Sequence, residues 1–233
     1  MRNCCENCRK DVCAKKVPIF STLDSCELSE IVDRIIHKKY KKKELIFSEG
    51  NKANTLYFVN EGKIKIYKYT KDGKEQILYL ISEGEFFGEL NILKEAKYGF
   101  NAEAIEDCKI CTLSKDDLKD LLIKKPIISI KMLEALTERI TSVENLVQNI
   151  ATNDVNSKIA YLLVSLADKY GIENAGCIII NLPMNREDMA NYIGITRETL
   201  SRKLKKFEED GLIQIVGTKK IVILNKTELK DYI

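Results

Sequence analysis

The chain has 233 residues, of which 45% are hydrophobic and 31% are charged, the ordinary composition of a soluble globular protein with one or two domains. The net charge is only +3, so a surface that binds a polyanion must be a local concentration of basic residues. No apolar run approaches the roughly 18 residues that a membrane span needs, and no signal peptide opens the sequence, so we expect a cytoplasmic protein without a membrane partner. A single histidine leaves little apparatus for acid–base catalysis and argues against an enzyme.

The first 16 residues contain closely spaced cysteines. Cys5, Cys8 and Cys13 form a C-x2-C-x4-C run, and Cys4 can take the place of Cys5. In a cytoplasmic protein such a run is typical of metal ligands or redox-active thiols rather than disulfides. Iron–sulfur clusters usually have four thiolate ligands, so a cluster here needs a fourth ligand from elsewhere in the chain. A zinc site, a thiol switch and a cysteine-rich tail without function are the alternatives.

The next part of the chain changes from a helical to a strand-like pattern. It predicts an extended segment over 17–20 and a helix over 28–37, capped by Asp24 or Ser25. Over 40–113, glycine-containing turn pairs recur at intervals of 12, 11 and 11 residues, with β-rich runs between them. Regular short strands at this spacing indicate an antiparallel roll or barrel.

A predicted helix over 115–124 leads into a longer one over 126–150, whose apolar positions repeat every three and four residues. That spacing is a heptad seam, the signature of a coiled coil. The seam consists of Leu133, Leu136, Ile140, Val143, Val147 and Ile150. Arg139 and Glu144 flank it at positions that pair across a parallel dimer. We therefore predict a homodimer through this helix; the alternative is a core helix that lies on its own domain.

The pattern of residues 151–233 predicts a winged helix-turn-helix. Its elements are a helix, a short strand, two helices joined through Gly194 and a β-hairpin. Thr196 can cap the second of the joined helices. Basic residues crowd that helix and the hairpin turn, where lysines can contact phosphates. They are Arg197, Arg202, Lys203, Lys205, Lys206 and Lys219.

Two stretches of the chain resemble the CRP/FNR family of regulators, named after the cyclic-AMP receptor protein and the fumarate–nitrate reduction regulator. Gly84–Leu90 looks like the loop of a cyclic-nucleotide-binding roll, and Ile193–Arg202 looks like the DNA recognition helix. The resemblance covers nearly the whole chain and implies an α+β protein. Its parts would be a cysteine-rich segment (1–16), a cyclic-nucleotide-binding-type β-roll (17–125), a dimerisation helix (126–150) and a winged helix-turn-helix (151–233).

At the recognition helix, the resemblance assigns base contacts to Glu198, Ser201 and Arg202, as in the FNR branch. Arg197 matches an arginine of the cyclic-AMP branch instead. The chemistry agrees, because arginine can form two hydrogen bonds to guanine and glutamate can accept one from cytosine. Two copies joined by the central helix would read inverted half-sites in double-stranded DNA, about one helical turn apart. The resemblance also implies RNA polymerase as a partner.

The FNR branch joins an N-terminal three-cysteine run to one cysteine from a late strand of the roll. Segment 106–118 places Cys111 at that position. The resemblance therefore implies an iron–sulfur cluster, of the 4Fe-4S type, held by Cys5, Cys8, Cys13 and Cys111. The chain departs from the best-known FNR pattern, which has one more residue between the second and third cysteines. Cys111 as a small apolar strand residue is the alternative.

Members that bind cyclic AMP have an arginine–serine pair against the cyclic phosphate, and this chain has Tyr98-Gly99 there. Because arginine supplies both charge and fork geometry for phosphate, we do not expect cyclic AMP to bind. The alternative to cluster sensing is a regulator that responds to haem, nitric oxide or a small effector in the roll. His37 falls on the predicted helix over 28–37 and is expected to be a packed or surface residue rather than a haem ligand.

Overall fold

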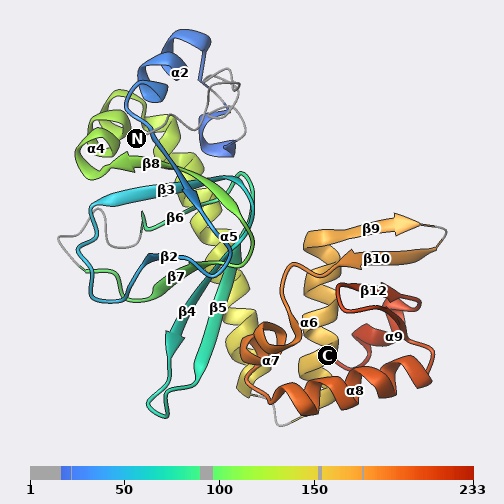
Figure 1. Cartoon of the computed structure of the whole chain (residues 1–233). Coiled ribbons are helices and arrows are strands. Elements are labelled where there is room, and N and C mark those ends of the chain that lie inside the picture. Colours follow the sequence, from blue (N-terminus) through green and yellow to red (C-terminus); the bar gives the residue numbers. More distant parts are fainter. Residues whose placement is uncertain (1–16, 22, 90–96, 152–153, 175) are drawn as a thin grey trace. The chain divides into compact units, whose positions relative to one another are not determined.

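The computed structural model describes residues 17–21, 23–89, 97–151, 154–174 and 176–233. Backbone contacts divide the chain into two compact units, a front unit (Met1–Tyr69 and Leu78–Ile140) and a rear unit (Thr70–Ile77 and Thr141–Ile233) (Figure 1). Within the described ranges, none of the helices is both long and apolar enough to cross a membrane.

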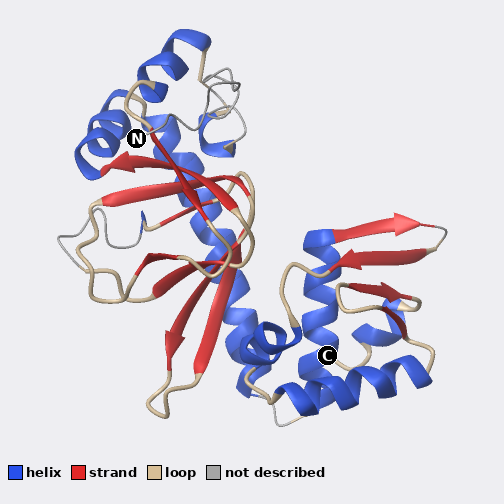
Figure 2. Cartoon of the chain, viewed as in Figure 1, coloured by secondary structure: helices blue, strands red, loops and turns tan. Residues whose placement is uncertain are grey.

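The front unit is built on a roll of two four-stranded sheets, drawn as red arrows in Figure 2. One sheet has the order β1-β8-β3-β6 and consists of β1 (Ile36–Tyr40), β8 (Cys108–Ser114), β3 (Thr55–Glu61) and β6 (Phe86–Phe87). The other has the order β2-β7-β4-β5 and consists of β2 (Leu45–Phe47), β7 (Asn101–Ala104), β4 (Ile64–Tyr69) and β5 (Glu75–Ile81). In the first sheet, β8 pairs antiparallel with both β1 and β3. This confirms the predicted antiparallel roll.

The turn glycines that suggested the roll all have positive φ. At Gly62 the requirement for glycine is twofold, because φ is +96° and a Cβ would lie 2.6 Å from Cys108 Sγ. An L-residue would therefore strain the backbone and clash with the neighbouring strand. The close approach lets the turn between β3 and β4 pack directly on β8.

A buried cluster joins the helices of the front unit to the first sheet. It contains residues of the 3-10 turn η1 (Pro18–Phe20), α2 (Ser25–Val32), α4 (Lys115–Lys124) and the start of α5 (Pro126–Ala151). Phe20, Leu28, Leu118 and Ile128 are each 0% exposed within it. Burying such apolar side chains contributes about 1.5–3 kcal/mol each, so this contact fixes α2 and α5 against the roll.

Two predictions for the start of the front unit were wrong. Residues 18–20 form a 3-10 turn rather than an extended segment, and α2 ends at Val32. Residues 36–40 form β1 instead, paired with residues 112–108 of β8. Ladder hydrogen bonds at a free sheet edge outweigh the local helical spacing, because propensity is a weak prior. The cap is Asp24, whose side chain accepts a hydrogen bond from Glu27 N in a reciprocal capping box.

The rear unit contains the predicted winged helix-turn-helix. It contains α6 (Val155–Tyr170), β9 (Gly171–Asn174), β10 (Cys177–Asn181), α7 (Arg186–Ile193), α8 (Arg197–Glu209), β11 (Ile213–Val216), β12 (Lys220–Ile223) and α9 (Lys226–Lys230). Its sheet has the order β11-β12-β10-β9. Strand β9 and helix α9 were not predicted. The core is formed by α6, whose Ile159, Leu162 and Leu163 are fully buried, together with the inner face of α8.

Candidate DNA interface and sensor sites

The turn between α7 and α8 is defined by capping residues at both sides. α7 ends at Gly194, which has φ +68°, a left-handed conformation that costs an L-residue about 1–2 kcal/mol. α8 begins after Thr196, whose hydroxyl oxygen accepts a hydrogen bond from Thr199 N at 3.2 Å. Between them, Ile195 N donates to Ala190 O at 3.0 Å. These contacts set the direction in which α8 leaves the turn.

α8 has one buried face and one exposed, polar face. Leu200, Leu204 and Phe207 are at most 2% exposed and hold the helix on its own unit. The exposed face carries the three predicted base readers together with Arg197, because positions three or four apart on a helix are neighbours. They are Arg197, Glu198, Ser201 and Arg202, all exposed. The geometry therefore gives one continuous surface with two guanidinium groups, a carboxylate and a hydroxyl.

The predicted phosphate contacts surround this face. Lys205 is exposed and Lys203 is half-buried on α8, while Lys219 is exposed in the turn between β11 and β12. Lys206 is also exposed, but its Nζ lies 2.6 Å from Oδ1 of Asp210, the residue that caps the C-terminal end of α8. The Asp210 carboxylate raises the pKa of Lys206 through this hydrogen bond. Lys206 thus has an internal counter-charge, which a DNA phosphate would have to displace.

Cys111 lies in the middle of β8 and is 5% exposed. It stands directly opposite His37 of β1 and Phe58 of β3, and its Sγ lies 3.3 Å from His37 Nδ1. Cys5, Cys8 and Cys13 lie outside the described residues. Of the four predicted ligands, the structure therefore describes Cys111 alone. In the described part of the chain, His, Cys, Asp and Glu side chains nowhere gather in groups of three or more suited to a metal.

Cys108 is in the same strand but has a different environment. Its Sγ donates to Glu106 O at 3.2 Å and lies 3.3 Å from Lys63 O. Burial raises the pKa of this thiol to about 11, so it remains a thiol at neutral pH. Of the two cysteines of β8, Cys111 is therefore the better candidate for a metal-binding thiolate.

The loop that resembles the cyclic-nucleotide motif directs a carboxylate into the roll. Gly88 has φ +88°, and a Cβ there would lie 2.9 Å from Thr55 O, so only glycine fits. The next residue, Glu89, is 4% exposed, and its Oε1 accepts a hydrogen bond from Arg139 Nη1 at 2.7 Å. Arg139 Nη2 donates to Phe86 O at 2.7 Å. Burial raises the pKa of the Glu89 carboxyl, and the Arg139 charge opposes that rise.

This pairing corrects the role expected for Arg139, which was predicted to face Glu144 of a second copy. The structure turns its guanidinium inward, with 13% of the side chain exposed, onto the roll of its own chain. The Tyr79 ring covers it, with the centroid 5.2 Å from Cζ. A heptad register cannot reveal this contact, because it depends on a buried carboxylate far away in the sequence.

The predicted seam on α5 splits into two rows. Leu133, Ile140 and Val147 are 63%, 59% and 61% exposed, whereas Leu136 and Val143 are half-buried. The side chain of Ile150 lies outside the described part. The exposed apolar surface continues toward the start of the helix, where Ile127 is 41% and Ile130 is 51% exposed; neither was included in the predicted seam. The available signal was their spacing, because Ile127 lies three residues before Ile130, and Ile130 lies three residues before Leu133.

Tyr98 is the residue that, by the resemblance described above, takes the place of the arginine in cyclic-AMP-binding rolls. Its side chain is buried, with the hydroxyl donating to Thr55 O at 2.9 Å. The ring stacks on Phe47 with centroids 3.8 Å apart, in a core that also includes Tyr57 and Phe87. At this position the roll therefore has an aromatic stack and a neutral hydroxyl, where a phosphate would require a cation.

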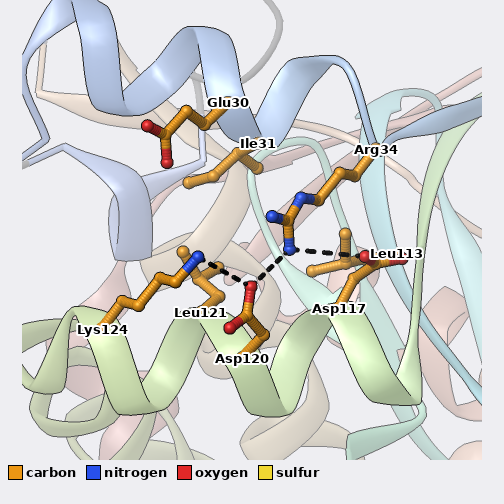
Figure 3. Close-up of a pocket in the computed structure, with 8 residues that line it drawn as sticks. All are labelled: Glu30, Ile31, Arg34, Leu113, Asp117, Asp120, Leu121 and Lys124. Atoms are coloured by element: carbon orange, nitrogen blue, oxygen red, sulfur yellow. Dashed lines mark hydrogen bonds and ion pairs between the residues drawn. The ribbon is translucent and has the colours of Figure 1, made fainter.

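A pocket between α2 and α4 is lined by charged residues that neutralise one another (Figure 3). Arg34 Nη1 lies 2.7 Å from Asp120 and 3.4 Å from Asp117, and Lys124 Nζ lies 3.1 Å from Asp120. These ion pairs hold the chain after α2 against α4, which leads directly into α5. We read this pocket as part of the packing of α2, because each of these charges already has an opposite charge beside it.

Comparison with known proteins agrees with this architecture. Residues 37–125 match the cyclic nucleotide-binding domain, and residues 157–232 match the Crp-like helix-turn-helix domain. The regulatory protein HlyX of Actinobacillus pleuropneumoniae is 30% identical over 226 residues, which cover 96% of this chain and 91% of the relative. The anaerobic regulatory protein of Bacillus subtilis (strain 168) is 26% identical over 215 residues, with coverage of 91% and 90%.

The structure of a CooA mutant from Carboxydothermus hydrogenoformans superposes with a TM-score of 0.80 at 20% identity, covering 93% of this chain and 94% of that one. At this identity the likeness concerns the fold, and it spans the roll, the long helix and the helix-turn-helix. The two domain matches and the full-length relatives identify the exposed face of α8 as part of a DNA-binding domain. This chain belongs to the CRP/FNR family and is a DNA-binding transcription regulator.

Proposed function

We propose that this regulator senses oxygen or redox state through an iron–sulfur cluster held by Cys5, Cys8, Cys13 and Cys111, and that the cluster controls its affinity for DNA. The observation that carries the proposal is the position of Cys111. Its side chain packs in the same buried hydrophobic cluster as Val17 and Phe20, which follow the cysteine run in the sequence. Val17 is four residues after Cys13, which allows a reach of about 14 Å in extended chain.

The donor chemistry of Cys111 suits the group. A thiolate is the normal ligand of cluster iron, and a ligand in the middle of a strand is held rigidly by the ladder on both sides. Cys108, at the start of the same strand, does not compete, because its sulfur is engaged by backbone carbonyls. The name of the Bacillus subtilis relative, an anaerobic regulatory protein, supports oxygen or redox as the signal.

The same buried cluster gives the sensor a physical route to the central helix. Leu118 of α4 and Ile128 and Met132 of α5 pack in it together with Cys111. Iron ligation by Cys111 and the N-terminal cysteines would tie the N-terminal segment to this buried hydrophobic cluster. Loss of ligation would release the segment. Packed interfaces of this kind have discrete arrangements, so release shifts α5 between two packings.

The apolar surface of α5 supports a homodimer as the DNA-binding form. Leu133, Ile140 and Val147 are each more than half exposed. An exposed apolar stripe at heptad spacing on one helix is typical of a surface that packs against a second helix. Two copies of α8 would then read inverted half-sites, with Arg202 on guanine, Glu198 on cytosine and the lysines on phosphates. RNA polymerase is the partner proposed for the DNA-bound dimer.

A small effector in the roll is the second candidate signal. Glu89 Oε2 is buried and has no hydrogen-bond partner in the described structure, a state that a ligand with a donor group would relieve. Cyclic AMP is not the effector we propose, because Tyr98 and its aromatic neighbours stand where its phosphate would need a cation.

The experiment is purification without oxygen, followed by iron and sulfide analysis, a visible spectrum and DNA-binding titrations before and after air. We expect about four iron and four sulfide per chain, a brown protein, and an operator affinity that changes on exposure to air. Cys111→Ser should lose the iron, while Cys108→Ser, in the same strand, should keep it. A colourless parent protein without iron, whose DNA affinity ignores air, would refute cluster sensing and leave the small effector.

A further inference from the structure

His37, the single histidine of the chain, lies against the proposed cluster ligand. It stands directly opposite Cys111 in the β1–β8 pair, so both side chains point to the same face of the sheet. The distance from Nδ1 to Sγ is 3.3 Å, which is short for a nitrogen–sulfur hydrogen bond. This contact was not predicted, because the sequence pattern places residue 37 in a helix.

The chemistry of a ligating sulfur fixes the direction of this hydrogen bond. A thiolate bound to iron carries no proton and can only accept, so the imidazole must carry its hydrogen on Nδ1 and donate. Cys111 is 5% exposed and surrounded by apolar side chains, where a negatively charged sulfur needs a donor. Hydrogen bonds to ligating sulfur are among the groups by which a protein stabilises and tunes a cluster.

We propose that His37 is a positioning residue for the cluster: its Nδ1–H donates to the Cys111 sulfur and holds that thiolate in place for iron. This proposal rests on the cluster function proposed above. Donation is favoured over direct ligation because four cysteines already supply one ligand to each iron of a 4Fe-4S cluster. The ring is also placed by β1, every residue of which pairs with β8.

The test compares two nearly isosteric replacements. His37→Asn keeps an N–H donor close to the place of Nδ1, and His37→Leu has similar size without a donor. Lys39→Leu is the matched control, because residue 39 lies on the same face of β1 but stands opposite Lys109. Anaerobic proteins are mixed with an iron chelator, and loss of the visible cluster absorption is followed with time.

Removing a partner of a metal ligand typically lowers metal affinity about 10- to 100-fold. If the dissociation rate carries that loss, His37→Leu should lose its cluster at least about 10-fold faster than the parent. His37→Asn and Lys39→Leu should stay close to the parent. In the reduced protein, labelled with ¹⁵N at histidine, pulsed electron paramagnetic resonance should show a weak nitrogen coupling that His37→Leu removes. Far-ultraviolet circular dichroism of each variant checks that the roll is folded.

Each result decides between the two proposals. If the parent holds iron and folded His37→Leu loses its cluster to the chelator at the parent's rate, the role of His37 is overturned and the cluster proposal stands. A strong nitrogen coupling would also overturn it, since His37 would then be a ligand. A parent purified without oxygen that holds no iron would overturn both the cluster and the role of His37.

Discussion

Replacing Arg139 by methionine should strongly destabilise the roll, because it leaves Glu89 buried without a cation. Glu89 is 4% exposed and accepts a 2.7 Å hydrogen bond from Arg139. Without that partner the cheapest response is to take up a proton. From an ordinary pKa of 4.5, protonation at pH 7 costs 2.5 units of 1.36 kcal/mol, or about 3.4 kcal/mol. This agrees with the roughly 3–5 kcal/mol lost when one partner of a buried ion pair is removed.

The cost should depend on pH, and the sign follows from the same carboxyl group. Burial already raises the pKa of Glu89 in the parent, and the Arg139 charge opposes that rise. Arg139→Met removes the opposing charge, so the pKa rises further and the folded variant binds more protons than the parent in the window above the parent's value. Stability is then lost as pH rises through that window and recovered as pH falls. At pH 5.5 protonation from 4.5 costs only about 1.4 kcal/mol, so the defect should shrink by up to about 2 kcal/mol, and by less to the extent that Glu89 of the parent also takes up a proton.

The assay is urea unfolding at pH 7 and pH 5.5, at a fixed protein concentration, followed by near-ultraviolet circular dichroism of the tyrosines. Glu89→Gln in the Arg139→Met background is the matched control, because it removes the titrating group and should remove the extra pH dependence. An Arg139→Met protein that loses less than about 1 kcal/mol, or loses the same amount at both pH values, would show that the buried pair is not the contact described here.

Other predictions concern the DNA face and the dimer. Arg202→Ala should cost about 1–3 kcal/mol of specific binding and relax one base position; equal losses on specific and random DNA in a titration would make it a phosphate contact. Leu133→Glu with Ile140→Glu should give a monomer in sedimentation, since both side chains are exposed in the single chain, whereas Ile36→Glu, equally exposed on β1, should not. Gly194→Ala should lower the stability of the rear unit by about 1–2 kcal/mol, measured by thermal unfolding, because φ is +68° there.

The parts of the chain that the sequence predicted well are those with a local physical signal. The turn glycines, the amphipathic helices and the basic face of α8 follow from periodicity, capping and charge, which act over a few residues. His37 and Arg139 were misplaced because their roles depend on partners far away, Cys111 and Glu89. No periodic pattern encodes such a contact, and the register of β1 on β8 is what reveals the first of them.

One row of side chains across the first sheet begins at His37 and ends at a residue that Arg139 contacts. His37 stands opposite Cys111, Cys111 opposite Phe58, and Phe58 opposite Phe86, so four side chains cross the sheet in line. At about 4.8 Å per strand the row is roughly 14 Å long. Its far end is the residue whose carbonyl accepts from Arg139 of α5 at 2.7 Å.

The row and the buried cluster reach α5 at two points, Met132 and Arg139, which lie two turns apart on the face turned to the roll. Leu133 and Ile140, one residue further on in each case, are on the exposed face. A change in packing that begins at the Cys111 sulfur would therefore reach α5 on the face that contacts the roll. The proposed dimer contacts lie on the opposite face of the same helix. Because packed side chains shift between discrete arrangements rather than deform smoothly, the roll can alter the dimer surface without any contact between Cys111 and a second chain.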